Sequence, residues 1–192
     1  MALGSEAVQT TSFDLVFTAH HSYVYKLAHT LLGNAQDAED ATQDVFLRVY
    51  KALPKFDPER ATMRTWLTKL TVNVCKTHKR RNFLHHLWKS SWPESTDDSS
   101  FDPIDLSRLG APEDQVLESE MRKTVKAVLG KLRVEHRTVL VLHYYLDLSC
   151  PEIASIMDCP EGTVYSRLHY ARRLVESHLE RDSRRSGSEV TL

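Results

Sequence analysis

Four side chains with hydrogen-bonding groups share one face of a predicted helix in TVYSRLHYARRLV, residues 163–175. The apolar positions at helical spacing, which should face inward, are Val164, Leu168, Ala171 and Val175. Tyr165, Ser166, His169 and Arg173 should therefore face outward together. A phenol, a hydroxyl, an imidazole and a guanidinium can contact base edges and phosphates in a major groove. The alternative is the solvated surface of an ordinary helix pair.

The residues before this face indicate how it is positioned. Ser149 and Glu152 have the S-x-x-E spacing of a capping box, which marks a helix start. Pro160 and Gly162 interrupt the helical pattern and predict a turn. A short helix, a tight turn and a longer helix form the outline of a helix-turn-helix. Cys159, in the turn, is expected to act as a small buried hydrophobe.

A second set of basic side chains lies on the predicted helix 63–81. Asn73, Lys76, Lys79 and Arg80 fall on roughly one face, and Arg64 and Lys69 extend the basic character. Aromatic residues occur nearby at Phe56, Trp66, Phe83 and Trp88. Cations beside aromatic rings suit single-stranded or distorted nucleic acid, because unstacked bases need a stacking partner. The alternative is that Phe56 and Trp66 belong to the hydrophobic core.

An acidic cluster opens the preceding helix, in the segment DAEDATQDVF. Carboxylates at a helix start complement the helix dipole. Asp37, Glu39, Asp40 and Asp44 exceed what capping requires, so the cluster is also a candidate protein-docking surface.

The sequence indicates no enzyme. It has no P-loop, no G-x-G-x-x-G, no H-E-x-x-H and no G-x-S-x-G. The one metal-like group is Cys75, His78, His85 and His86, whose spacing matches no zinc pattern. We expect no catalytic residues, no metal and no cofactor.

The net charge of −1 hides a strongly uneven distribution. Residues 57–92 carry a net +6, residues 93–120 a net −8 and residues 121–192 a net +3. Two basic regions that flank an acidic one are compatible with nucleic-acid binding. With three cysteines and no C-x-x-C pair, a disulfide framework is not expected. The sequence shows no signal peptide and no run long enough to span a membrane, which predicts a cytoplasmic protein.

The periodicity predicts an all-α protein of two small helical domains joined by a flexible acidic linker. The expected helices cover about 13–32, 36–53, 63–81, 113–129 and 135–146, followed by the helix-turn-helix. The expected organisation is a disordered tail 1–11, a first domain 12–90, a linker 91–111, a second domain 112–181 and a disordered tail 182–192.

Three stretches resemble the extracytoplasmic-function (ECF) group of bacterial RNA polymerase sigma factors. GNAQDAEDATQDVFLRVYKALPKFDP is similar to sigma region 2.1–2.2, MRTWLTKLTVNVCKTHKRR to region 2.3–2.4, and PEIASIMDCPEGTVYSRLHYARRLV to region 4.2. The three occur in the order and at the spacing of the family. The resemblance implies a sigma region 2 domain at 12–90 and a region 4 domain at 112–181.

The resemblance also implies roles for particular residues. Region 4 would bind the −35 element through Thr163, Tyr165, Ser166, Arg167, His169, Tyr170, Arg172 and Arg173. Region 2 would bind the −10 element, capturing a flipped base in the loop and through Asn73, with the set Phe56, Arg60, Thr62, Arg64, Asn73, Lys76, Lys79 and Arg80. Core polymerase would dock on Asp37, Glu39, Asp40, Gln43, Asp44 and Arg48.

The partners implied are core RNA polymerase, through the β′ clamp helices and the β flap, promoter DNA and an anti-sigma factor. Three positions depart from the family pattern. Thr77 stands where members often have Asp, and Tyr165 and Tyr170 stand where they often have Arg or Lys. Tyrosine has one hydroxyl, so Tyr165 cannot read guanine in a bidentate manner.

The leading interpretation is a promoter-specificity subunit without enzymatic activity. The alternative is a two-domain helix-turn-helix regulator that binds duplex DNA without polymerase. The basic helix and aromatic loop of residues 56–81 favour the first, because a repressor has no need of them.

Overall fold

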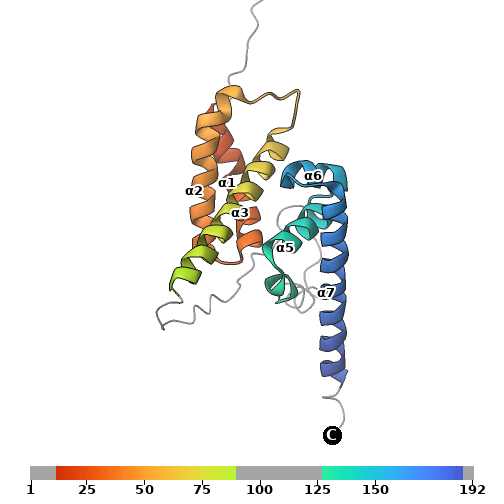
Figure 1. The fold of residues 1–192 in the computed structure, drawn as a ribbon. Helices are drawn as coiled ribbons and strands as arrows, with labels where there is room; N and C mark the ends of the chain where they lie inside the picture. The colour runs from red at the N-terminus through yellow and green to blue at the C-terminus, as the bar shows by residue number, and fades with distance from the viewer. Residues whose placement is uncertain (1–11, 90–126, 188–192) are drawn as a thin grey trace, which may run out of the picture.

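The computed structural model describes residues 12–89 and 127–187, with side chains in 12–81 and 127–181. All regular elements in these ranges are helical, which confirms the all-α prediction. Helices α1 (Phe13–Leu32), α2 (Ala35–Ala52) and α3 (Met63–Lys89) form one bundle. Helices α5 (Val134–Leu140), α6 (Cys150–Met157) and α7 (Glu161–Gly187) form a second bundle beside it (Figure 1).

Local sequence signals fix the sharp corner between α1 and α2. Gly33 adopts a φ of 89°, a left-handed conformation that glycine tolerates best, and its N–H donates to the carbonyl of His29 at 2.8 Å. Asn34 then caps α2 by accepting a hydrogen bond from the N–H of Asp37 at 2.7 Å. The predicted end of this helix at about residue 32 is thus confirmed.

The first bundle buries one apolar stripe from each of its three helices. Val24 and Leu31 of α1, Val45 of α2 and Leu67 of α3 are fully or almost fully buried. A hydrogen bond of 2.6 Å between the hydroxyls of Tyr23 and Thr68 joins α1 to α3 inside this packing.

Two helices extend beyond their predicted ends. Helix α3 continues to Lys89 instead of ending at residue 81, because no Gly or Pro interrupts NFLHHLWK. Helix α7 continues to Gly187, so residues 182–187 are helical and not part of a disordered tail. Helix α2 ends at Ala52, and a 3₁₀ turn over Leu53–Lys55 accommodates Pro54.

The second bundle departs from the regular helix predicted for residues 135–146. Helix α5 ends at Leu140, and a π-helical turn follows at Val141–Tyr145. The N–H of Leu146 there donates to the carbonyl of Val141 at 3.1 Å. Asp147, at a φ of 53°, turns the chain toward α6. The predicted helix 113–129 lies mostly outside the described residues, which are helical at 127–131.

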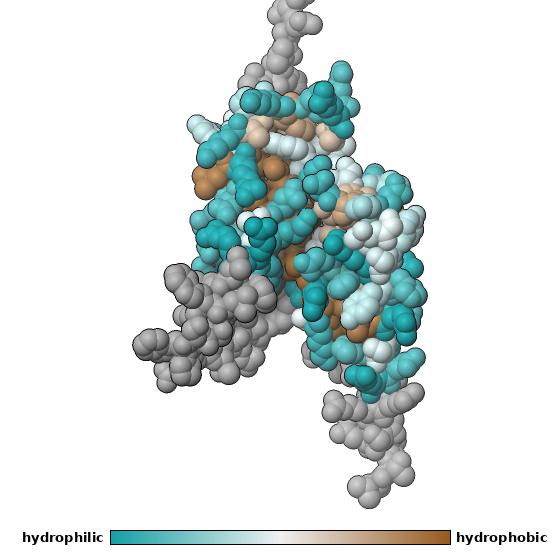
Figure 2. All heavy atoms as spheres, viewed as in Figure 1, coloured by the Kyte–Doolittle hydropathy of each residue, from teal (hydrophilic) through white to brown (hydrophobic). Residues whose placement is uncertain are grey.

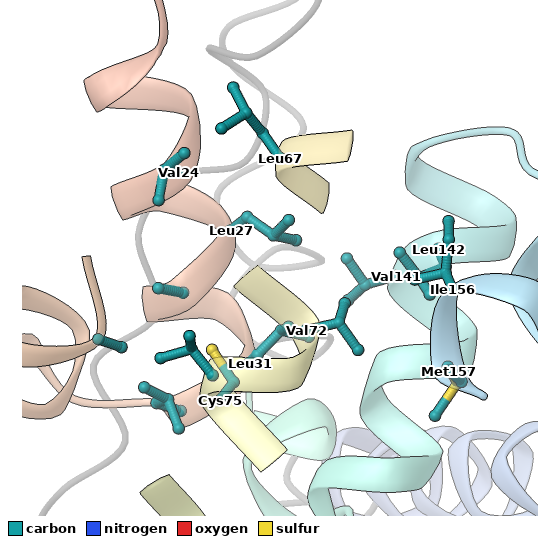
Figure 3. Close-up of a cluster of buried hydrophobic side chains, with 14 of the residues drawn as sticks. Val24, Leu27, Leu31, Leu67, Val72, Cys75, Val141, Leu142, Ile156 and Met157 are labelled. Atoms are coloured by element: carbon teal, nitrogen blue, oxygen red, sulfur yellow. The ribbon is translucent and has the colours of Figure 1, made fainter. Parts of the chain in front are cut away.

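The two bundles share one hydrophobic core. Helix α3 packs against α5 and α6, and α1 packs against α5. Figure 3 shows Val72 of α3 pointing toward Val141 and Ile156 of the second bundle, all of which are buried. The sequence predicted two domains, but no local pattern indicated which of their residues would come into contact.

Candidate nucleic-acid interface

The predicted recognition helix α7 has the expected inner and outer faces. Val164, Leu168 and Ala171 are buried, whereas the predicted DNA-facing side chains are mostly exposed. The exposed members are Tyr165, Ser166, His169, Tyr170, Arg172 and Arg173, and Thr163 and Arg167 are half-buried.

The turn before α7 is built as the sequence indicates. The carboxylate of Glu152 accepts hydrogen bonds from the N–H and the hydroxyl of Ser149, which completes the predicted capping box. Asp158 adopts a φ of 52°, and the N–H of Cys159 donates to the carbonyl of Ala154 at 3.1 Å. These contacts set the direction in which α7 leaves the turn. Cys159 is half-buried and packs against the core.

Internal contacts restrict what two residues on the outer face can offer DNA. The hydroxyl of Ser166 donates its one hydrogen to the carbonyl of Thr163 at 3.0 Å. Its oxygen can therefore accept a hydrogen bond from DNA, but the group cannot donate one as well. Tyr165 is hydrogen-bonded to the thiol of Cys150, and electrostatic interaction with that thiol raises the pKa of the phenol. Both residues are thus held by the helix-turn-helix itself.

Three further members of the predicted −35 set contact other helices or the turn. The ring of Tyr170 lies 4.6 Å from that of His136, measured between centroids. The guanidinium of Arg172 lies 5.4 Å above the ring of Tyr144. Arg167 reaches the sulfur of Cys159 at 3.9 Å. Of the three arginines in this part of the helix, Arg173 is best placed to reach a phosphate without losing such a contact.

The loop between α2 and α3 forms a pocket against α1. Phe56 packs on Trp66 with ring centroids 5.0 Å apart, and Thr62 begins α3 by accepting from the N–H of Thr65 at 3.2 Å. A cavity of about 370 Å³ opens beside this loop. Its lining consists of Leu15, Val16, Ala19, His20, Phe56, Pro58, Ala61, Thr62 and Met63.

The sequence reasoning missed the α1 side of this pocket. Positions 15, 16, 19 and 20 have the spacing of one helix face, and that signal was available in the sequence. Partial burial of Trp66 against the core agrees with its interpretation as a packing residue. Among the predicted −10 residues, the structure places Phe56 and Thr62 in the wall of the pocket.

The rest of the predicted −10 set lies elsewhere. Arg60 pairs with Asp57 at 3.2 Å, and the guanidinium of Arg64 lies 4.7 Å above the ring of Tyr23. Asn73 is half-buried and follows Met63 by about 15 Å along α3, taking 1.5 Å per residue. Asn73 and the loop pocket are therefore two separate points along the axis of α3. Arg80 is exposed and Lys79 is half-buried.

Lys76 does not face solvent as predicted. Its ammonium donates to the carbonyl of Met157 at 2.8 Å, at the end of α6 in the second bundle. The expected row of free cations on α3 is therefore interrupted at this position, because α6 packs there. This packing could not be predicted from the spacing of residues within α3.

The acidic cluster on α2 divides into two kinds of residue. Glu39, Asp40, Gln43 and Arg48 are exposed. Asp37 serves the cap of α2, where it accepts from the side-chain amide of Asn34 at 3.0 Å. Asp44 lies 3.2 Å from Nε2 of His78, so it faces α3 and is not simply outward-facing.

Exposed apolar side chains accompany the polar ones on this bundle. Leu47 and Tyr50 of α2 are 60% and 66% exposed, and Phe17 of α1 is 40% exposed. Figure 2 shows apolar surface over the α1–α2 part of a largely hydrophilic face. The pattern of polar residues predicted the carboxylates as a docking surface, but it did not indicate that these apolar side chains are exposed beside them.

A second apolar hollow lies on the other bundle, with a volume of about 420 Å³. Its walls come from the helical residues 127–131, α5, the π-helical turn and α7. They consist of Leu129, Leu140, Val141, Tyr144, Tyr145, Arg172, Val175 and Glu176.

The described residues contain no group of three metal-ligating side chains. Cys75 is fully buried, which raises the pKa of its thiol well above the ordinary value. The side chains of His85 and His86 lie outside the described residues. No helix within the described ranges is long and apolar enough to cross a membrane.

A helix-turn-helix joined to a bundle with a basic third helix defines a class of helical DNA-binding proteins, and comparison with known proteins narrows the class. Residues 16–83 match the family model of sigma-70 region 2, and residues 122–175 match that of sigma-70 region 4. The chain belongs to the sigma-70 family of RNA polymerase sigma factors, in its ECF group.

Relatives cover most of the chain. The RNA polymerase sigma-H factor of Pseudomonas aeruginosa is 30% identical over 88% of this chain and 86% of its own. The ECF sigma factor SigW of Bacillus subtilis is 31% identical over 88% and 89%. The sigma factor RpoE of Bartonella quintana, solved with the anti-sigma factor NepR, has the same fold, with a TM-score of 0.65 and 19% identity over 88% of this chain and 96% of that one.

Proposed function

We propose that this protein binds core RNA polymerase and directs it to promoters by reading a −35 element with α7 and a −10 element with the first bundle. One observation carries the proposal. This chain of the sigma-70 family has an exposed polar face on α7 and a second, basic surface on α3. Sigma factors are initiation factors without enzymatic activity, and we expect none from this chain.

The upstream element would be read by few direct base contacts. Ser166 offers an acceptor, which suits the N–H₂ group of adenine or cytosine. His169 is exposed and can contact a base edge, and Tyr165 supplies one hydroxyl. Arg173 would contact a phosphate, with Arg172 following once it leaves Tyr144. Because these contacts are too few for tight binding, specificity would be shared with region 2 through polymerase.

The downstream element would be held at two separate points. An unstacked base would enter the loop pocket beside Phe56 and Thr62, where apolar walls favour a ring. Asn73 would contact a different nucleotide, since it lies about 15 Å away along α3. Arg64, Arg80, Lys79 and, when released, Lys76 would neutralise phosphates.

Polymerase would dock on both bundles. The exposed groups Glu39, Asp40, Gln43 and Arg48, with Leu47 and Tyr50 beside them, suit the β′ clamp helices. The apolar hollow lined by Leu140, Tyr144 and Val175 suits the β flap. An anti-sigma factor is a further expected partner, because the sigma factor RpoE, which has this fold, has been solved with the anti-sigma factor NepR. CnrH, which also has this fold, has been solved with the cytosolic domain of CnrY. With these partners, the protein would act in the cytoplasm.

Transcription in vitro with and without this protein tests the proposal. Core polymerase alone should give no promoter-dependent start, and addition of the protein should create one. A chain that instead binds one duplex tightly and specifically without polymerase, and gives no start with it, would be a helix-turn-helix regulator.

A further inference from the structure

Two tyrosines stand at the borders of the outer face of α7, one on each side. Tyr165 and Tyr170 are 58% and 50% exposed, so both rings are open to a partner. At about 100° per residue they lie about 140° apart around the helix, and the exposed Ser166, His169 and Arg173 fall between them. A duplex that meets the middle of this face therefore meets both rings.

The ring of Tyr170 is held by α5. Its centroid lies 4.6 Å from that of His136, and the two ring planes are inclined at 40°. The Nδ1 atom of His136 is buried and has no hydrogen-bond partner among the residues that the structure describes, so ring packing, and not a hydrogen bond from that nitrogen, fixes the imidazole. An aromatic side chain held in this way loses little conformational entropy when it contacts a partner.

The ring of Tyr165 is held by α6. Its hydroxyl is hydrogen-bonded to the thiol of Cys150, the first residue of that helix. The hydroxyl is therefore already engaged inside the helix-turn-helix. The part of this side chain that remains open to DNA is the apolar ring.

Two held rings at the borders of a recognition face suit the C5-methyl group of thymine. In the major groove thymine displays this apolar methyl group, whereas guanine displays two hydrogen-bond acceptors. A tyrosine has one hydroxyl, so neither Tyr165 nor Tyr170 can make the paired hydrogen bonds by which an arginine reads guanine. Contact between an aromatic ring and a methyl group needs no hydrogen bond and leaves the Tyr165–Cys150 contact intact.

We propose that Tyr165 and Tyr170 read thymine methyl groups at two different base pairs of the upstream element, and that Cys150 and His136 position the two rings. This role rests on the proposed function, which places α7 in the major groove, and within it Tyr165 contributes its ring and not its hydroxyl. The two tyrosines are about 7.5 Å apart along α7, at 1.5 Å per residue, which is about two base-pair steps of 3.4 Å. The two methyl groups therefore belong to different base pairs.

Selection of upstream elements, followed by removal of single methyl groups, tests this role. Holoenzyme should enrich thymine at two positions of a randomised upstream element. Each selected thymine is then replaced by deoxyuridine, which lacks the C5-methyl group but pairs in the same way. Two of these replacements should each weaken binding about fourfold, the value of one buried methyl group, while those elsewhere in the element serve as controls and should have no effect. Selection of guanine at the positions read by the rings, or no loss with deoxyuridine at any position, would overturn the role.

Variants of the two tyrosines assign the positions and separate the ring from its hydroxyl. Tyr170→Ala should abolish the deoxyuridine effect at one position and Tyr165→Ala at the other, because no ring remains to contact the methyl group. Tyr170→Phe should keep the effect within about twofold of the parent, because the ring and its contact with His136 are retained. Loss of thymine preference in Tyr170→Phe would assign the reading to the hydroxyl and overturn the role of the ring.

Matched variants of the two partners test positioning. His136→Phe keeps a ring against Tyr170 and should preserve the deoxyuridine effect, whereas His136→Ala should reduce it at the Tyr170 position alone. Cys150→Ser keeps a hydrogen-bonding group beside Tyr165, whereas Cys150→Ala removes it and should reduce the effect at the Tyr165 position alone. Far-ultraviolet circular dichroism must show that helix content is retained. Equal effects within each matched pair of folded variants would overturn the positioning role.

Failure of this role can be told from failure of the proposed function. A promoter-dependent start that is insensitive to every upstream deoxyuridine would overturn the reading of methyl groups and leave the proposed function standing. If polymerase gives no start, the same replacements are made in the duplex that the chain binds by itself. Losses at two thymines there would support the rings as readers, and only the polymerase role would fail. A chain that binds no DNA in either assay would overturn both.

Discussion

Replacement of Arg173 by alanine should weaken promoter binding equally on all upstream sequences. The side chain is exposed on the outer face of α7, one turn beyond His169, where a phosphate contact is expected. Loss of one phosphate contact lowers the slope of log K against log salt by about 0.9. Between 0.05 and 0.2 M salt, parent and variant affinities should therefore converge by about 3.5-fold.

Two arginines on the same helix serve as comparisons. Arg172 must leave the ring of Tyr144, 5.4 Å away, at a cost of about 0.5–1 kcal/mol, so Arg172→Ala should change the slope less. Arg181 is exposed farther along α7, and Arg181→Ala should leave the slope unchanged.

The assay is equilibrium binding of holoenzyme to a labelled promoter at several salt concentrations, repeated on promoters with altered upstream bases. Ser166→Ala and His169→Ala should behave differently, each relaxing preference at one or two base pairs by roughly 1–3 kcal/mol. An unchanged salt slope for Arg173→Ala, or a loss confined to one sequence, would refute the assignment of this side chain to a phosphate.

Three further predictions follow from the other surfaces. Glu39→Lys with Asp40→Lys should reduce core polymerase binding at least about tenfold, because like charges placed in an interface repel; normal capture by the folded double variant would remove the docking assignment. Asn73→Ala should reduce open-complex formation by about 1–3 kcal/mol and closed-complex formation little, which duplex and pre-melted templates can distinguish; an equal loss on both templates would contradict it. Burial lowers the pKa of His136, so at mildly acidic pH the folded chain binds fewer protons than the unfolded chain. The free energy of unfolding should therefore fall as the pH drops below about 6.5, which thermal unfolding measured from pH 8 to pH 5 can test. His136→Gln should reduce that fall in stability relative to the parent. An unchanged pH profile in this variant would show that His136 is not the group responsible.

Helix positions and inner faces were predictable from the sequence because they depend on local spacing. The stop at Gly33, the capping box at Ser149 and the inward side of α7 each rest on residues within one or two turns. Helix ends were less predictable where no Gly or Pro marks them, as at Lys89 and Gly187. The π-helical turn was not predictable, because it depends on how Val141 and Leu142 pack in three dimensions.

The candidate site was predictable only in part, for the same physical reason. Outward-facing residues of α7 follow from one helix, and all of the predicted set except Thr163 and Arg167 are exposed. The loop pocket needs α1, and the positions of Lys76 and Asp44 depend on neighbours distant in sequence. Long-range partners of this kind leave no periodic signal in a single sequence.

The continuous core has a thermodynamic consequence for the chain as a whole. Val72, Val141 and Ile156 lie in one buried cluster, so unfolding of either bundle strips apolar contacts from the other. The free protein should then unfold in one cooperative calorimetric transition, with equal van't Hoff and calorimetric enthalpies. This is expected even though the chain contains two separate family regions, sigma-70 region 2 and region 4. A destabilising substitution in α6 should lower the melting temperature of α1–α3 as well, and separation of the bundles by a partner should divide the transition into two.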